Sequence, residues 1–330
     1  MKKYVSIVLA VLLAVVTLAS CGQPAPKADV NVTAIAGPTG VGMVSLMEQN
    51  EQGEAANNYT FNLVSDPQEA VAALTKGEAD IAAVPTNLAA TLYTNKMKDK
   101  VQVLAVNTLG VLYMLENGNS ITKVSDLVGK TIYTSGQGAN PEYILRYVLE
   151  KNGIDPDKDV KIEFVADNDA LTAAVVTGTA QVAMVPEPKV TACRVQAKAK
   201  EKTPANIVLN MTEEWDKVAD GDSKLMMGCV IARTEFIEQN PAAVKAFLKE
   251  YKKSIETVNA DVDAAATLCE KYQVIPKAAI AKQAIPNCNL VYVDGKDMKA
   301  QLGGYLAVLN SYNPKAIGGA VPTDGFYYGG

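Results

Sequence analysis

Residues 64–85 read VSDPQEAVAALTKGEADIAAVP, and the pattern returns at residues 165–186 as VADNDALTAAVVTGTAQVAMVP. The two stretches align without a gap at an offset of 101 residues, and nine of their 22 positions are identical. Alanine accounts for several identities, but three shared residue types have structural roles. These are the aspartate, glycine and proline at Asp66/Asp167, Gly77/Gly178 and Pro85/Pro186. The repeat therefore predicts two units built in the same way.

Each copy predicts a helix that leads into a buried strand. In the first copy Asp66 can cap a helix with Pro67 at its first position, and Glu69 completes the spacing of a capping box. Gly77 can adopt the left-handed conformation that ends a helix. The short apolar run at 79–84 is typical of a strand buried in a parallel sheet. The second copy predicts the same elements at 167–177, 178 and 180–185.

A matching unit precedes each copy. Residues 30–36 and 130–134 read as strands, and each runs into a glycine-rich loop and then a helix. The second of these helices is the clearer one, with Asn140 expected as its cap and Pro141 at its first position. The repeated order of strand, helix, strand, helix and strand predicts two α/β domains with parallel sheets.

The rest of the chain is mainly helical and returns to the first unit. Helices are expected from 240 onward and at 261–272, 276–284 and 297–312, after a returning strand at 225–232. Two linkers between the lobes predict a hinge with a cleft. We therefore expect lobe 1 at 30–115 and 225–330 and lobe 2 at 116–224.

The N-terminus reads as an export signal. Lys2 and Lys3 precede an apolar run at 5–19, which is too short for a typical membrane span of roughly 20 residues. The run ends in Leu-Ala-Ser-Cys at Cys21, which resembles a bacterial lipobox. We expect a lipoprotein signal peptide at 1–20, lipidation at Cys21 and a tether at 21–29. A cleaved signal followed by a chance cysteine is the alternative.

The composition excludes several kinds of binding and catalytic site. The 330 residues are 48% hydrophobic and carry a formal net charge of −5, so the chain is globular and offers no basic surface for nucleic acid. Histidine is absent, which removes histidine bases and histidine-containing zinc sites. The four cysteines after Cys21 fit no metal or redox motif. Cys269 and Cys288 could pair, although isolated buried thiols are commoner. We expect no cofactor, no metal and no catalytic residue.

Several motifs in a fixed order resemble the substrate-binding proteins of ABC importers. They are VSDLVGKTI at 124–132, ADIAAVP at 79–85, VPEP at 185–188 and EFIEQNPAAV at 235–244. The likeness is greatest to the group serving nitrate, sulfonate and taurine, thiamine-pyrimidine precursor and riboflavin uptake. It implies a type II periplasmic-binding-protein fold, with two doubly wound lobes joined by a two-strand hinge.

The resemblance also implies a function. It indicates a receptor, expected as a monomer, that is lipid-anchored on the extracytoplasmic face of the plasma membrane. It would capture a small solute by hinge closure and deliver it to an ABC permease. The same fold resembles a yeast pyrimidine synthase and menaquinone-pathway enzymes, but a lipobox and the lack of histidine fit neither. A non-transport sensor or an enzyme using Glu187 as a base remain alternatives.

In open parallel sheets, ligands lie beyond the carboxyl ends of the strands. The expected binding residues at these strand ends are Thr39, Gly40, Thr86, Asn87, Thr108, Gln137, Asn140 and Glu187. Met226 and Trp215 could add apolar walls. Several of them could instead cap helices or shape turns. Glu187, which lies between two prolines, is the strongest candidate for a ligand contact. The alternative is that its carboxylate only stabilises the N-terminus of a helix.

The charge inventory favours one ligand class. The three arginines, Arg146, Arg194 and Arg233, lie away from the expected cleft loops, whereas amino-acid receptors commonly clamp carboxylates with arginine. A neutral or weakly basic heterocycle, such as a pyrimidine, thiamine precursor or flavin, fits best. A small anion held at a helix N-terminus, such as a sulfonate, taurine or nitrate, is the alternative.

Overall fold

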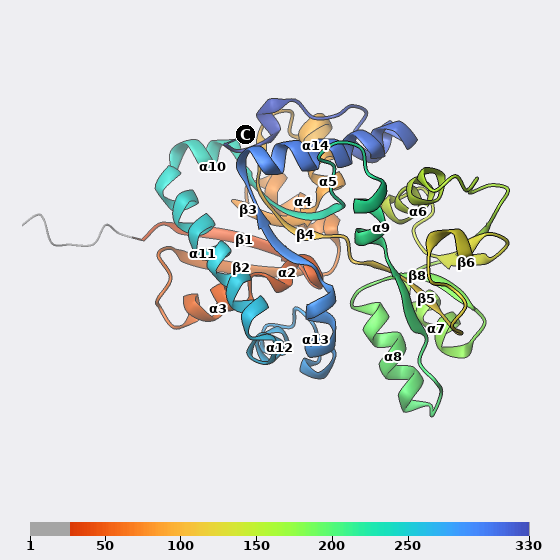
Figure 1. Cartoon of the computed structure of the whole chain (residues 1–330). Coiled ribbons are helices and arrows are strands. Elements are labelled where there is room, and N and C mark those ends of the chain that lie inside the picture. The colour runs from red at the N-terminus through yellow and green to blue at the C-terminus, as the bar shows by residue number, and fades with distance from the viewer. Residues whose placement is uncertain (1–26, 330) are drawn as a thin grey trace, which may run out of the picture.

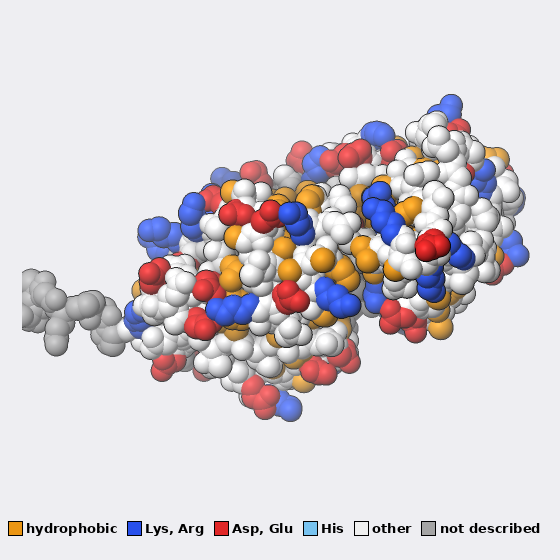
Figure 2. Space-filling view, turned by 90° about the horizontal axis from the view of Figure 1, so that it is seen from below, with side chains coloured by type: hydrophobic (Ala, Val, Ile, Leu, Met, Phe, Trp, Pro, Cys, Tyr) orange, Lys and Arg blue, Asp and Glu red, His pale blue; other side chains and the backbone are white. Residues whose placement is uncertain are grey.

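The computed structural model describes residues 27–329, which form two α/β lobes side by side (Figure 1). The expected signal peptide, Cys21 and most of the tether lie outside the described residues. Acidic and basic side chains are interspersed over both lobes on the face shown in Figure 2, and hydrophobic side chains gather near the junction between the lobes. Within residues 27–329, no helix is long and apolar enough to cross a bilayer.

The larger lobe contains a six-stranded sheet in the order β11-β4-β10-β3-β1-β2. β1 pairs in parallel with β2 and β3, whereas β10 runs antiparallel to both β3 and β4. The strands are β1 (Asp29–Ile35), β2 (Asn58–Val64), β3 (Ile81–Pro85), β4 (Val101–Leu109), β10 (Met226–Arg233) and β11 (Leu290–Val293).

The smaller lobe contains a five-stranded sheet in the order β7-β6-β8-β5-β9. Its strands are β5 (Leu112–Glu116), β6 (Thr131–Thr134), β7 (Lys161–Phe164), β8 (Val182–Pro186) and β9 (Asn206–Asn210). β6 is parallel to β7 and β8, and β5 is antiparallel to β8 and β9. The expectation of parallel sheets therefore holds for only part of each sheet, because both are mixed. Strands that arrive from the other lobe, β5 and β10, lack the crossover helix that a parallel neighbour requires.

Helices cover both sheets. They are α2 (Pro38–Val41), α3 (Val44–Glu51), α4 (Pro67–Lys76), α5 (Thr86–Thr91), α6 (Asn140–Lys151), α7 (Asn168–Thr177), α8 (Lys189–Ala199), α9 (Met211–Val218), α10 (Thr234–Gln239), α11 (Pro241–Ala260), α12 (Val262–Lys271), α13 (Ala278–Ala284) and α14 (Gly295–Tyr312). The four C-terminal helices expected from the sequence are thus confirmed. α11 and α14 pack on the large sheet, whereas α12 and α13 pack on each other and on neighbouring helices. Phe247 and Tyr251 of α11 are fully buried.

The repeat is confirmed as two equivalent helix–strand units. Asp66 accepts a hydrogen bond from the Gln68 amide at the start of α4, and Asp167 accepts two amide hydrogen bonds at the start of α7. Gly77 and Gly178 end the helices with φ of 77° and 88°. The side-chain half of the capping box expected from Glu69 is not among the hydrogen bonds of the described residues.

Replacing Gly178 with alanine should lower the free energy of unfolding by about 1–2 kcal/mol, because a Cβ atom disfavours the left-handed conformation. An added Cβ meets no atom within 4 Å, so the loss would come from backbone strain and not from a clash. Urea unfolding measures this loss. Thr179→Ala, at an exposed neighbouring position, is the control, and an equal loss in both variants would contradict the assignment.

The chain passes from the six-stranded sheet to the five-stranded sheet earlier than the sequence suggested. β4 ends at Leu109 and β5 begins at Leu112, so the first crossing lies at Gly110 and Val111 and not after residue 115. The difference arises because residues 112–116 pair with β8 and β9. The return crossing lies between α9 and β10.

The four cysteines of the described residues are buried and free: Cys193, Cys229, Cys269 and Cys288. Cys269 and Cys288 are therefore not joined in this structure. Burial raises the pKa of the Cys193 thiol to about 11 and that of Cys269 to about 12, which keeps both thiols protonated near neutral pH.

Candidate ligand-binding cleft between the lobes

A cavity of about 290 Å³ lies between the two lobes. Five of the residues expected from the sequence line it: Thr39, Asn87, Thr108, Asn140 and Glu187. Thr108 lies near the carboxyl end of β4, and the other four follow strands at the same edge, which is the site expected for open α/β sheets. The cavity thus joins loops that are far apart in the sequence.

Asn140 and Asn87 connect the lobes across this cavity. Asn140 Nδ2 donates a hydrogen bond of 3.1 Å to Asn87 Oδ1. Asn140 Oδ1 is buried and has no hydrogen-bond partner within residues 27–329. The N-cap position of α6 is Ala139, and no side chain caps the helix there. The cap interpretation of Asn140 is therefore wrong, and its free oxygen is an acceptor that a ligand can use.

Glu187 contributes a buried carboxylate to the cavity wall, with 3% of the residue exposed. Its oxygens accept hydrogen bonds from the Thr191 amide and hydroxyl, each at 3.1 Å. Asn287 Nδ2, from the other lobe, donates a third at 3.1 Å. Glu187 therefore supports the start of α8 and also lines the cavity.

Burial raises the pKa of the Glu187 carboxyl above its ordinary value, although hydrogen bonds from Thr191 and Asn287 act in the opposite direction. The folded protein then holds this proton more tightly than the unfolded chain. The free energy of unfolding should consequently fall as pH rises from the unfolded pKa through the folded pKa.

Replacing Glu187 with glutamine should remove this part of the pH dependence, since glutamine does not titrate. Urea unfolding of both proteins from about pH 4 to 8 measures the difference. We expect the wild type to lose stability relative to the variant as pH rises. Parallel curves for the two proteins would contradict a raised pKa.

The remaining predicted residues do not line the cavity. Thr86 is fully buried and its hydroxyl donates to the Met226 carbonyl at 2.7 Å. The glycine at position 40 is required by packing, since a Cβ there would lie 2.6 Å from the Ile35 carbonyl oxygen. Gln137 is exposed, and Met226 is fully buried in the core. Its neighbour Met227 lines the cavity in its place, because adjacent strand residues face opposite sides.

The interpretation of Trp215 as a stacking surface for a ligand was wrong. The side chain is fully buried, with ring centroids 4.3 Å from Tyr147 and 5.5 Å from Tyr305. It fills the space between α9, α6 and α14. The tryptophan occupies the inward face of α9.

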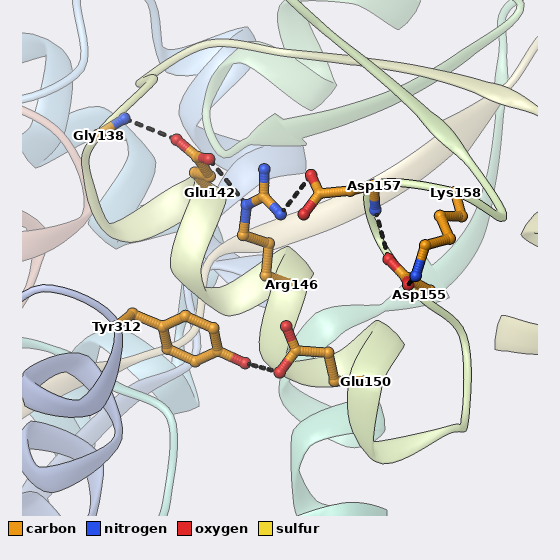
Figure 3. Close-up of polar contacts among 8 residues, drawn as sticks. All are labelled: Gly138, Glu142, Arg146, Glu150, Asp155, Asp157, Lys158 and Tyr312. Atoms are coloured by element: carbon orange, nitrogen blue, oxygen red, sulfur yellow. Dashed lines mark hydrogen bonds and ion pairs between the residues drawn. The ribbon is translucent and has the colours of Figure 1, made fainter.

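The loop before Asn140 is held by a polar chain along α6 (Figure 3). The Gly138 amide donates to Glu142 Oε2 at 2.7 Å, and Arg146 Nε donates to Glu142 Oε1 at 2.8 Å. Arg146 Nη1 also donates to Asp157 at 2.9 Å. The guanidinium is thus engaged in fixing the loop that precedes Asn140. Sequence reasoning missed this role because Asp157 approaches α6 only in the folded lobe.

Comparison with known families gives a match over residues 60–265 to the family model described as NMT1/THI5 like. The chain belongs to this family. Among curated proteins, no sequence match was found.

Solved structures match nearly the whole chain. An ABC transporter protein from Parabacteroides distasonis is 20% identical with a TM-score of 0.74, covering 92% of this chain and 99% of that one. The periplasmic aliphatic sulphonate binding protein SsuA from Escherichia coli is 14% identical with a TM-score of 0.68, covering 92% of each chain. The alkanesulfonate-binding protein SsuA from Xanthomonas axonopodis pv. citri, bound to MOPS, is 14% identical with a TM-score of 0.61, covering 91% and 96%. These likenesses confirm the expected two-lobed type II periplasmic-binding-protein fold.

Proposed function

We propose that this protein is the solute-binding component of an ABC importer and holds a small organic molecule in the cavity between its lobes. The observation that carries the proposal is the convergence of Asn87, Asn140 and Glu187 from both lobes on one cavity. A molecule that contacts both lobes stabilises their closed arrangement, and a permease can recognise that arrangement.

The polar groups of the cavity favour a ligand that donates hydrogen bonds. Asn140 Oδ1 lacks a donor, and Glu187 is the one charged side chain among the lining residues. A ring N–H, an amine or a hydroxyl would satisfy both acceptors. The volume of about 290 Å³ lies just below the roughly 300–1,000 Å³ typical of ligand pockets, which favours a single ring over a flavin. A neutral or weakly basic single-ring heterocycle, such as a pyrimidine, is the ligand class that we propose.

A small anion is the second candidate, because the printed names of two similar structures describe sulfonate-binding proteins. The N-terminal end of α6 at Asn140 would offer backbone amides to such a group. The buried carboxylate of Glu187 opposes this candidate, since it would repel an anion in a poorly solvated cavity.

Thermal unfolding with a panel of solutes tests the function and separates these classes. A ligand present at about 100 times its dissociation constant adds roughly 2.7 kcal/mol to the free energy of unfolding, which appears as a higher midpoint. We expect pyrimidines to raise the midpoint and sulfonates, taurine and nitrate to leave it unchanged. A rise with anions alone would overturn the proposed ligand class, and no rise with any solute would count against the proposed function.

We also propose that the mature protein is anchored by lipid at Cys21 on the extracytoplasmic face of the plasma membrane, as a monomer. The sequence at 18–21 supports this anchoring. Replacing Cys21 with serine should abolish labelling by radioactive palmitate in cells and move the protein from the membrane to the soluble fraction. Unchanged labelling in the variant would contradict lipidation at this residue.

A further inference from the structure

A second and larger pocket, of about 680 Å³, lies between α6 of the smaller lobe and α14 of the larger lobe. Figure 1 shows α14 extending from its own lobe toward α6. Asp220 and Ser223, from the return crossing between the lobes, close the third side. None of its lining residues belongs to the cavity that contains Asn140 and Glu187.

Two hydroxyl groups in the walls of this pocket are poorly satisfied. Tyr147 and Ser223 are each 5% exposed; Ser223 Oγ has no partner among residues 27–329, and Tyr147 Oη has only a weak backbone contact with Asp220. A buried hydroxyl without a partner costs about 1–3 kcal/mol. Polar atoms of a bound molecule, reached by small side-chain movements, would recover that cost.

The rim of the pocket supplies both acceptors and donors. Tyr312 donates to Glu150 Oε2 at 2.5 Å (Figure 3), and Lys151 forms an ion pair with Asp220 Oδ2 at 2.5 Å. Each carboxylate keeps a second oxygen that has no partner within the described part of the chain. The Lys151 ammonium has three donors in total. Tyrosine rings from both lobes and the aliphatic side chain of Val308 provide apolar walls.

We propose that this pocket binds a small polyhydroxylated molecule, a sugar or a polyol. Hydroxyl groups both donate and accept, so they match the mixture of free carboxylate oxygens, ammonium protons and poorly satisfied hydroxyls. Two carboxylates disfavour an anion, and Lys151 disfavours a cation. The tyrosine rings can pack against the C–H faces of such a ligand.

The position of the pocket couples its ligand to the arrangement of the lobes. A Cβ at Gly304 of α14 would lie 2.8 Å from Ser223 Cβ, so the return crossing packs directly against α14 at this point. A ligand here contacts both lobes and the crossing that joins them. Its binding therefore changes the equilibrium between lobe arrangements, and with it the affinity of the other cavity for a solute. By linkage, a solute in the other cavity changes the affinity of this pocket by the same factor.

Titration of the protein with glucose, ribose and glycerol, followed by amide NMR, tests the proposal. We expect at least one of these probes to give saturable shifts at residues of α6, α14 and the return crossing. Tyr147→Phe removes one hydroxyl and should weaken binding about 2- to 10-fold, the range for one hydrogen bond. Tyr133→Phe, in the same lobe and outside the pocket, is the matched control.

Val308→Trp should fill the pocket and abolish the shifts, and its folding can be checked by circular dichroism. If that variant does not fold, Tyr147→Phe alone decides the test. No saturable shift with any of the three probes would overturn the proposal. Equal affinity in the wild type and Tyr147→Phe would overturn it as well. The titration is carried out without a solute in the other cavity, so its outcome does not depend on the proposed function.

Discussion

Replacing Trp215 with alanine should lower the free energy of unfolding by about 3–5 kcal/mol, the usual cost of removing a large buried aromatic side chain. The indole is fully buried on α9 and packs between Tyr147 of α6 and Tyr305 of α14. Its removal leaves a cavity at the place where the two lobes and the return crossing meet. Urea unfolding followed by circular dichroism measures the loss.

Trp215→Phe is the matched comparison, because it keeps an aromatic ring in the same space. We expect a smaller loss of stability in this variant and an unchanged affinity for a solute of the cleft. If Trp215→Ala instead kept its stability and lost solute binding, the tryptophan would belong to the binding site and the packing described here would be wrong.

Replacing Glu187 with alanine should weaken binding of a heterocycle that donates an N–H group by about 10- to 150-fold. This range corresponds to the roughly 1.5–3 kcal/mol of a hydrogen bond to a charged group. The carboxylate is buried in the cavity wall and held by Thr191 and Asn287, so a ligand meets an acceptor that is already oriented. Calorimetric titration with the solute identified by thermal unfolding measures the change.

The same substitution removes a hydrogen bond from the Thr191 amide at the start of α8, so stability must be measured in parallel. The loss of a cap is expected to cost about 0.5–2 kcal/mol. Glu69→Ala, an exposed carboxylate in the first turn of α4, is the control and should leave affinity unchanged. A Glu187→Ala protein that loses stability but keeps its affinity would reduce Glu187 to a helix cap.

Local features of the fold were predictable from the sequence because they depend on neighbouring residues. The helices α4 and α7 begin at their aspartates and end at Gly77 and Gly178, as the repeat indicated. The strand directions were not predictable in the same way. β5 and β10 enter sheets formed by distant segments, and the repeat contains no information about strands that lie outside it.

The candidate site was predictable only in part, for physical reasons that individual residues illustrate. The ends of strands located Asn87, Asn140 and Glu187 because parallel strands place these ends at one edge. The free oxygen of Asn140 depends on contact between the lobes, which no local pattern describes. Met227 lines the cavity and Met226 does not, because a difference of one residue reverses the side of a strand on which the side chain lies.

Hydrogen exchange measured with and without the solute that raises the unfolding midpoint is the most direct test of binding between the lobes. We predict slower exchange at backbone amides around Thr39 and Asn87 of one lobe, and also around Asn140 and Glu187 of the other. Both groups of amides should respond at the same solute concentration, because one molecule contacts both lobes. Protection confined to one lobe, or located away from these four positions, would contradict the account.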